Sequence, residues 1–399
     1  MPTKRRDLRL PQELIDAVVL ELRDDSACLA ACSKTAKTFR VPCQRLIFRE
    51  MVIHSEESGY PNTYRRASDL LTSSPHLEAQ VLNISTAWPT EENDMHAFEA
   101  VLRLLRSVQR LVISNTGFVS WRTYPALNAA MFDFISLPSL DRLHLIKMDE
   151  VPSSLIYHAA SSVRVLSLEI YLDQTNVSEP PVEPSPSSPQ LEHFILSSRP
   201  TFYLSTFVSR LSRGGYLRNT RRLTLSLEER QEGYQNLFDS LPLSLRHLEI
   251  DYGLFRGIMS IPKLESLQVL ELNLYIGMTR SLPSNLDRIV TKLPELTPLL
   301  ERLTLTFRTM PRIPEIPWST QDGSWPVFDV GFLERRELPR LCKVTCCLQL
   351  TMDYFHGDSD VSYTGFVTAL ERKLPGLRGT DMLIFTQKNS SYRYQDHLP

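Results

Sequence analysis

Cysteine, histidine and acidic residues are the side chains of this sequence that could form a metal site or a catalytic centre. Cys28 and Cys32 stand one helical turn apart and could share a ligand face, but no Cys or His pair at zinc-finger spacing follows them. In the "TCC" triplet at 345–347, a strand would turn neighbouring side chains to opposite faces. Gly-rich phosphate loops, H-E-x-x-H and G-x-S-x-G are absent from the sequence. The sequence therefore predicts no enzyme, metal or cofactor, and residues that converge only in the folded chain remain the alternative route to an active site.

A second group of polar residues recurs at fixed positions of a short repeated phrase, apolar-x-x-apolar-x-apolar. Its copies start at 79, 108, 140, 163, 191, 220, 245, 267, 300 and 341. The residue before the second apolar position is often basic, and acidic or polar residues follow two and four places later. From these positions the candidate substrate-binding residues are Arg110, Arg142, Arg222, His247, Glu249, Glu271, Tyr275 and Arg302. Such a stripe could select an acidic or phosphorylated segment; alternatively, its basic and acidic rows pair with each other, which is the reading we favour.

The phrase itself is typical of a strand. Alternate side chains of a strand face opposite sides, so the last two apolar residues of each copy point into a core and the residues between them point outward. Copies recur at intervals that average about 29 residues, within the range of leucine-rich repeats. Proline often precedes the strand, as in "LPSLDRL" and "LPRLCKV", which suits a connecting loop. The sequence therefore predicts an α/β fold in which stacked strands form a parallel sheet on the concave face of a solenoid, with short helices and loops on the convex face.

The first fifty residues have a different pattern, which is typical of short helices. In "LPQELIDAVVLEL", Pro11 suits a helix start, and the apolar residues share one predicted helical stripe; these are Leu14, Ile15, Val18, Val19 and Leu22. Asp24, Asp25 and Ser26 suit the cap of a second helix. A segment with so few apolar residues cannot easily form an independent core. We therefore expect the cluster to pack against the repeats or against another protein.

Leu10-Pro11-x-Glu13-Leu14-Ile15, Val18-Val19, Leu22, Leu29-x-x-Cys32-Ser33 and Phe39 together resemble an F-box. The continuation "RVPCQRLIFREMVIH" and the ending "FVTALERKLPGLRGTDMLIFTQ" are similar to a large family of fungal F-box proteins with irregular leucine-rich repeats. The resemblance implies a substrate-recognition adaptor of an SCF-type cullin-RING ubiquitin ligase. In such an adaptor the F-box binds a Skp-type linker subunit and the repeats bind a protein substrate.

By this resemblance the linker-binding candidates are Leu10, Pro11, Leu14, Ile15, Val19, Leu22, Leu29 and Phe39. Each of them could instead fill the core of the helical cluster. In the alternative function, the chain is a non-ligase leucine-rich-repeat scaffold whose opening helices cap the solenoid. The two functions predict different environments for the opening helices. An adaptor keeps Leu14, Ile15 and Val19 exposed, whereas a cap packs them against residues near 46–84.

Composition limits the partners and the domain plan. A formal net charge of -2 gives no broad attraction to nucleic acid or anionic membrane, and the apolar runs are too short to span a bilayer. Six sparse cysteines favour the cytoplasm or nucleus, and a monomer is expected outside the ligase complex. The predicted plan is a disordered basic start at 1–7, an F-box domain at 8–50 and a repeat domain at 51–399. Within the repeat domain we expect a disordered Pro/Ser loop at 173–190 and an ordered insertion near 310–329.

Overall fold

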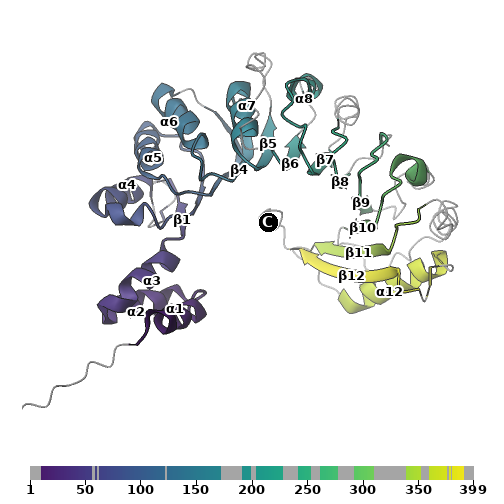
Figure 1. The fold of residues 1–399 in the computed structure, drawn as a ribbon, viewed down its shortest axis with the longest axis horizontal. Helices are drawn as coiled ribbons and strands as arrows, with labels where there is room; N and C mark the ends of the chain where they lie inside the picture. Colours follow the sequence, from purple (N-terminus) through teal and green to yellow (C-terminus); the bar gives the residue numbers. More distant parts are fainter. Residues whose placement is uncertain are drawn as a thin grey trace, which may run out of the picture. The chain divides into compact units, whose positions relative to one another are not determined.

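In the computed structural model the chain divides into two compact units, Met1–Asp149 and Glu150–Pro399. Figure 1 shows the helices and strands of both units, coloured along the sequence. The described residues are 10–55, 59–60, 63–121, 124–171, 191–198, 204–227, 241–252, 261–276, 292–309, 338–351, 359–374, 377–378 and 380–390. The predicted basic start, Pro/Ser loop and ordered insertion lie outside these residues.

Unit 1 begins with a cluster of three helices, α1 (Gln12–Glu21), α2 (Ser26–Thr35) and α3 (Lys37–Ile47). The side chain of Asp25 caps α2 by accepting a hydrogen bond of 2.9 Å from the backbone N–H of Cys28, as the sequence predicts. The core of the cluster consists of Ile15, Val19, Leu29 and Cys43, and the half-buried apolar residues around it come from the three helices and from Leu22 at the end of α1. The cluster therefore has a small core of its own.

The rest of unit 1 alternates strands and helices. It contains β1 (Glu50–Ile53), α4 (Tyr64–Ser73), the 3-10 turn η2 (Pro75–Leu77), β2 (Asn83–Thr86), α5 (Glu92–Leu104), β3 (Arg110–Ser120), α6 (Pro125–Ile135) and β4 (Arg142–Asp149). Each strand pairs in parallel with the next one along the chain. The helices pack on one another through apolar and aromatic side chains; the rings of Tyr64 in α4 and Phe98 in α5 lie 5.3 Å apart.

Unit 2 continues the same alternation. Its elements are α7 (Ser153–Ser162), β5 (Val165–Tyr171), β6 (His193–Ser198), α8 (Leu204–Arg213), β7 (Arg222–Leu227), β8 (His247–Asp251), β9 (Val269–Ile276), β10 (Arg302–Thr309), β11 (Lys343–Thr351), α12 (Ser359–Lys373) and β12 (Leu383–Ser390). Every pairing from β5 to β12 is parallel and follows chain order. The predicted parallel sheet is confirmed, and the ten copies of the phrase coincide with β2 to β11.

Alternation along each strand gives the sheet of unit 2 an apolar face and a polar face. In β7 and β8, for example, Leu223, Leu225, Leu248 and Ile250 are buried. The apolar face packs against helices, since the ring of Phe307 in β10 lies 5.5 Å from that of Phe366 in α12. The intervening residues form the polar face, as predicted. None of the described helices is long and apolar enough to cross a membrane.

Candidate functional site

The structure separates the linker-binding candidates of the opening helices into exposed and buried sets. Leu10 and Leu14 are 60% and 53% exposed, and Pro11 is exposed as well. Ile15 and Val19 are only 3% and 2% exposed and face the three-helix core. The predicted apolar stripe on α1 is thus covered only in part: its Ile15 side faces the other helices, and its Leu14 side is exposed.

The remaining candidates in this cluster also belong to its core or its margin. Leu29 is 1% exposed, while Leu22 and Phe39 are half-buried and pack against the core. Val18, absent from the candidate set, is 52% exposed and lies one helical turn beyond Leu14. The expectation that Ile15 and Val19 stay exposed is therefore not met. Leu10, Leu14 and Val18 follow one another at helical spacing and are all exposed, and we call them the α1 apolar patch; Leu20 and Val41 are further exposed apolar residues of the cluster.

The cysteines of the helical cluster have few features of metal ligands. Cys32 packs against the core, and burial raises the pKa of the Cys43 thiol. The hydrogen bond with Asp25 raises the pKa of the Cys28 thiol. In β11, burial raises the pKa of Cys346 to about 12. Since metals bind the thiolate, raised pKa values disfavour these groups as ligands.

On the polar face of unit 2, Glu249 is the centre of a hydrogen-bonded network. Arg222 lies one strand away, with its Nη2 atom 3.4 Å from Oε2 of Glu249. The hydroxyl of Thr224 donates to the same oxygen at 3.2 Å, and the amide of Asn273 donates to Oε1 at 3.2 Å. Parallel register brings these residues together: Thr224 lies directly opposite Glu249, while Arg222 and Asn273 lie on the neighbouring strands two positions before and two positions after that row.

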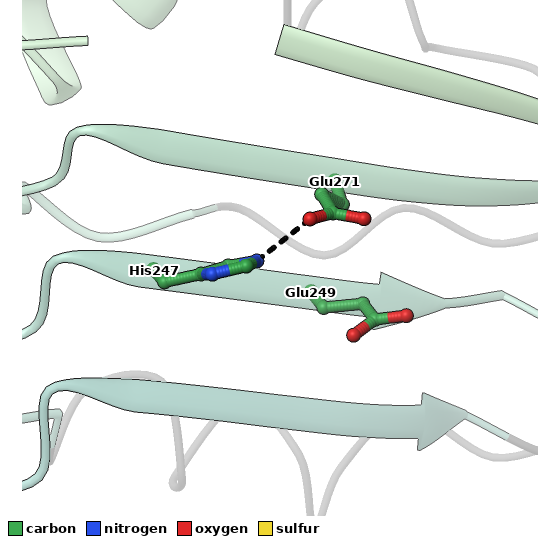
Figure 2. Close-up of side chains that lie close together, drawn as sticks. All are labelled: His247, Glu249 and Glu271. Atoms are coloured by element: carbon green, nitrogen blue, oxygen red, sulfur yellow. Dashed lines mark ion pairs between the residues drawn. The ribbon is translucent and has the colours of Figure 1, made fainter. Parts of the chain in front are cut away.

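His247 and Glu271 form a second pair beside this network, with 2.9 Å between Nε2 of His247 and Oε1 of Glu271 (Figure 2). The interaction with His247 lowers the pKa of Glu271 and outweighs the opposing effect of burial. Figure 2 shows the two side chains pointing toward each other from neighbouring strands.

The imidazole of His247 and the carboxylates of Glu249 and Glu271 are also the described group that comes closest to a metal site. One ligand atom from each lies within 4.8 Å of the others, and all three are donors that zinc accepts. However, Glu271 already pairs with His247, and the guanidinium of Arg222 would repel a cation bound by Glu249. The arrangement fits an internal ion-pair network better than a metal centre.

The next strands extend this pairing. Arg308 in β10 pairs with Asp251 in β8, and its Nε atom donates to Oε1 of Gln349 in β11 at 3.0 Å. Arg302 is exposed at the start of β10. Tyr275 belongs to β9, but its side chain lies outside the described part of the chain. The charged rows of the polar face therefore pair with each other, as the favoured sequence interpretation expects.

The two remaining candidates, Arg110 and Arg142, lie in unit 1, where they are register neighbours on β3 and β4. Arg142 lies 3.5 Å from Asp141. His144 is fully buried beside them, and neither ring nitrogen has a hydrogen-bond partner among the described residues. Burial, aided by both arginines, lowers the pKa of His144 to about 3, so its ring is neutral at physiological pH.

Sequence reasoning missed Thr224 as a member of the Glu249 network. Its position was informative, because it follows Arg222 by two residues in the repeated phrase and so shares the polar face. The position alone did not reveal its partner, which depends on strand register.

No protein-family model matches this chain, and no curated protein matches it in a sequence comparison.

Proposed function

We propose that this protein is a substrate-recognition adaptor of an SCF-type cullin-RING ubiquitin ligase. In this proposal α1–α3 form an F-box that binds a Skp-type linker subunit, which connects the chain to the cullin. The alternating strands and helices form an irregular leucine-rich-repeat solenoid that binds a protein substrate. The assembly works in the cytoplasm or the nucleus.

The observation that carries the proposal is a self-contained helical cluster with an exposed apolar patch. All core residues of α1–α3 come from residues 15–47, so the cluster does not need the repeats to cover its apolar interior. Leu10, Leu14 and Val18 are each more than half exposed. Exposed apolar side chains that neighbour one another mark a binding surface more often than single ones do. A helical cluster that only capped the repeats would turn these side chains toward them.

The repeats would supply the substrate side without chemistry of their own. In unit 2, neighbouring strands present polar residues on one face of the sheet, which would give a surface for a protein partner. The adaptor would then act by effective concentration, since it holds substrate lysines near a ubiquitin-conjugating enzyme on the same scaffold.

The test is binding of the full chain to the Skp-type linker subunit, measured by surface plasmon resonance. The informative variant is Leu14→Glu with Val18→Glu, which places charge on the α1 apolar patch. The matched control is Leu20→Glu, because Leu20 is 51% exposed on the same helix but lies about 120° around it from Leu14. Circular dichroism checks that all variants keep their helix content.

We expect the wild type and Leu20→Glu to bind and the double variant to lose binding by about a hundredfold or more, since charges at an apolar interface are strongly unfavourable. Equal binding by all three would move the interface elsewhere on the cluster. A folded wild type that does not bind would exclude the adaptor and leave the non-ligase interaction scaffold.

A further inference from the structure

Two arginines of unit 2 are held side by side at the start of neighbouring strands. Arg221 precedes β7, and Arg246 precedes β8. The backbone carbonyl of Arg221 accepts hydrogen bonds of 2.9 Å from the N–H groups of both Arg246 and His247. The carbonyl of Arg246 is held in the same way by Gln268 and Val269 of the next strand. This ladder fixes the two arginines one strand spacing apart, about 4.8 Å.

A polar cavity of about 210 Å³ lies between these strand starts. Its lining residues are Glu192, Asn219, Arg221, Ser244, Arg246 and Ser266. Liquid water occupies roughly 30 Å³ per molecule, so the cavity has room for a tetrahedral oxyanion and the first atoms attached to it. The hydroxyl of Ser244 donates to the carbonyl of Arg218 at 2.9 Å, which fixes the wall on which it stands.

Both arginines of the cavity are exposed, and among the described residues neither Arg221 nor Arg246 has an ion-pair partner. The acidic lining residue, Glu192, pairs with Arg164 at 2.9 Å on the neighbouring strand. Arg164 thus offsets part of the repulsion between Glu192 and an anion in the cavity. The starts of β7 and β8 thus differ from the polar face of the sheet, where Arg222 and Arg308 each pair with a carboxylate.

We propose that the cavity between Arg221 and Arg246 binds the phosphate group of a phosphate monoester. Two guanidinium forks match the oxygens of phosphate, and their two charges match its charge of about −1.5 to −2 at pH 7. Asn219 and Ser266 add polar groups to the same wall. The phosphate could belong to a modified protein side chain or to a small molecule. This inference does not rest on the ligase function, since it uses only residues of unit 2.

The experiment titrates the full chain with inorganic phosphate and with O-phosphoserine, each followed by the line width of its ³¹P resonance. The variants are Arg221→Gln, Arg246→Gln and the double variant. The matched control is Arg213→Gln with Arg340→Gln, which removes the same total charge from two exposed arginines that do not line the cavity. A capped tetrapeptide with a central phosphoserine, and its unphosphorylated form, are then compared by isothermal titration calorimetry.

Line broadening by the wild type and the control is expected, with affinity falling about tenfold for each cavity arginine removed. Binding should also weaken with salt, because the site is near the surface. A phosphopeptide that binds more tightly than inorganic phosphate assigns the group to a phosphorylated side chain, and equal affinities assign it to a small phosphate compound. Equal broadening by the wild type and the double variant, or equal losses in the control, would overturn the proposal. If the chain fails to bind the linker subunit, the adaptor function is excluded, but the phosphate titration still tests the cavity independently.

Discussion

The exposure difference between Leu14 and Ile15 gives a direct test of how α1 packs. Ile15 is 3% exposed inside the three-helix core, and Leu14 is 53% exposed beside it. Truncating a buried Ile to Ala costs about 2–5 kcal/mol, and the cost is lower where neighbours can move into the space. The core of this cluster has half-buried neighbours, so we expect about 2–3 kcal/mol for Ile15→Ala. For Leu14→Ala we expect about 0.5 kcal/mol or less, as for an exposed site.

Hydrogen exchange measured by mass spectrometry reads these costs locally, which matters because a chain of two units need not unfold in one step. Peptides covering α1–α3 should exchange about 30- to 150-fold faster in Ile15→Ala, the factor that corresponds to 2–3 kcal/mol. The same peptides should be nearly unchanged in Leu14→Ala, and peptides from β8 serve as an internal reference. If Leu14→Ala accelerates exchange as much as Ile15→Ala does, α1 buries a different face and the α1 apolar patch does not exist.

Three further predictions concern the sheets. Glu249→Ala should lower the stability of unit 2 by about 1–2 kcal/mol in urea unfolding, because it leaves the buried amide of Asn273 without its acceptor, while the partly exposed ion pair adds little. A loss of unfolding free energy no larger than that of an exposed substitution would contradict this role of Glu249. His144 has a folded pKa of about 3 against 6.5 for the unfolded chain, so the unfolded state binds more protons and stability should fall as pH drops from 6.5 toward 3. His144→Leu should flatten that part of the curve of urea midpoint against pH, and an unchanged slope would show that other groups cause it. Phe366→Ala should release α12 from the sheet at a cost of about 3–5 kcal/mol, which exchange of α12 peptides measures; protection equal to wild type would mean that the contact with Phe307 is not stabilising.

Strand positions were the part of the fold that the sequence predicted best. A period of two, repeated with a fixed apolar phrase, is a strong signal, and parallel pairing follows when successive strands are joined by return segments. The sequence did not predict β1 and β12, because "EMVI" and "LIFTQKNS" lack the repeated phrase. These two strands pair with β2 and β11 through backbone hydrogen bonds, which carry no sequence signature.

Helix faces were harder to predict than strands. Leu14 and Ile15 differ by about 100° around α1, so a broad apolar stripe on the sequence cannot tell which side the other helices cover. That choice depends on where Leu29 and Cys43 lie, which is a tertiary property. Contacts on the polar face depend on register in the same way. The repeated phrase places Glu249 on that face, but only strand pairing puts it next to Arg222.

The position before each strand also lacked a pattern that singled it out. It holds Arg164, Glu192, Arg221, Arg246 and Gln268 in successive strands of unit 2, a mixed series that resembles ordinary loop polarity. Which residues of this series can bind a ligand depends on which of them pair with each other across neighbouring strands. Glu192 pairs with Arg164 on one side, and among the described residues the two arginines that follow it have no ion-pair partner.

This difference in pairing bears on where the chain recognises an anion. A ligand that binds the polar face must compete with the carboxylates that already pair with Arg222 and Arg308, and of these two pairs the Arg308–Asp251 pair is the less exposed. A ligand that binds between Arg221 and Arg246 breaks no ion pair of these two arginines among the described residues, and it meets two like charges carried on neighbouring strands. The polar face is therefore better suited to hold the strands in register. We expect an anion to bind at the starts of β7 and β8, between Arg221 and Arg246.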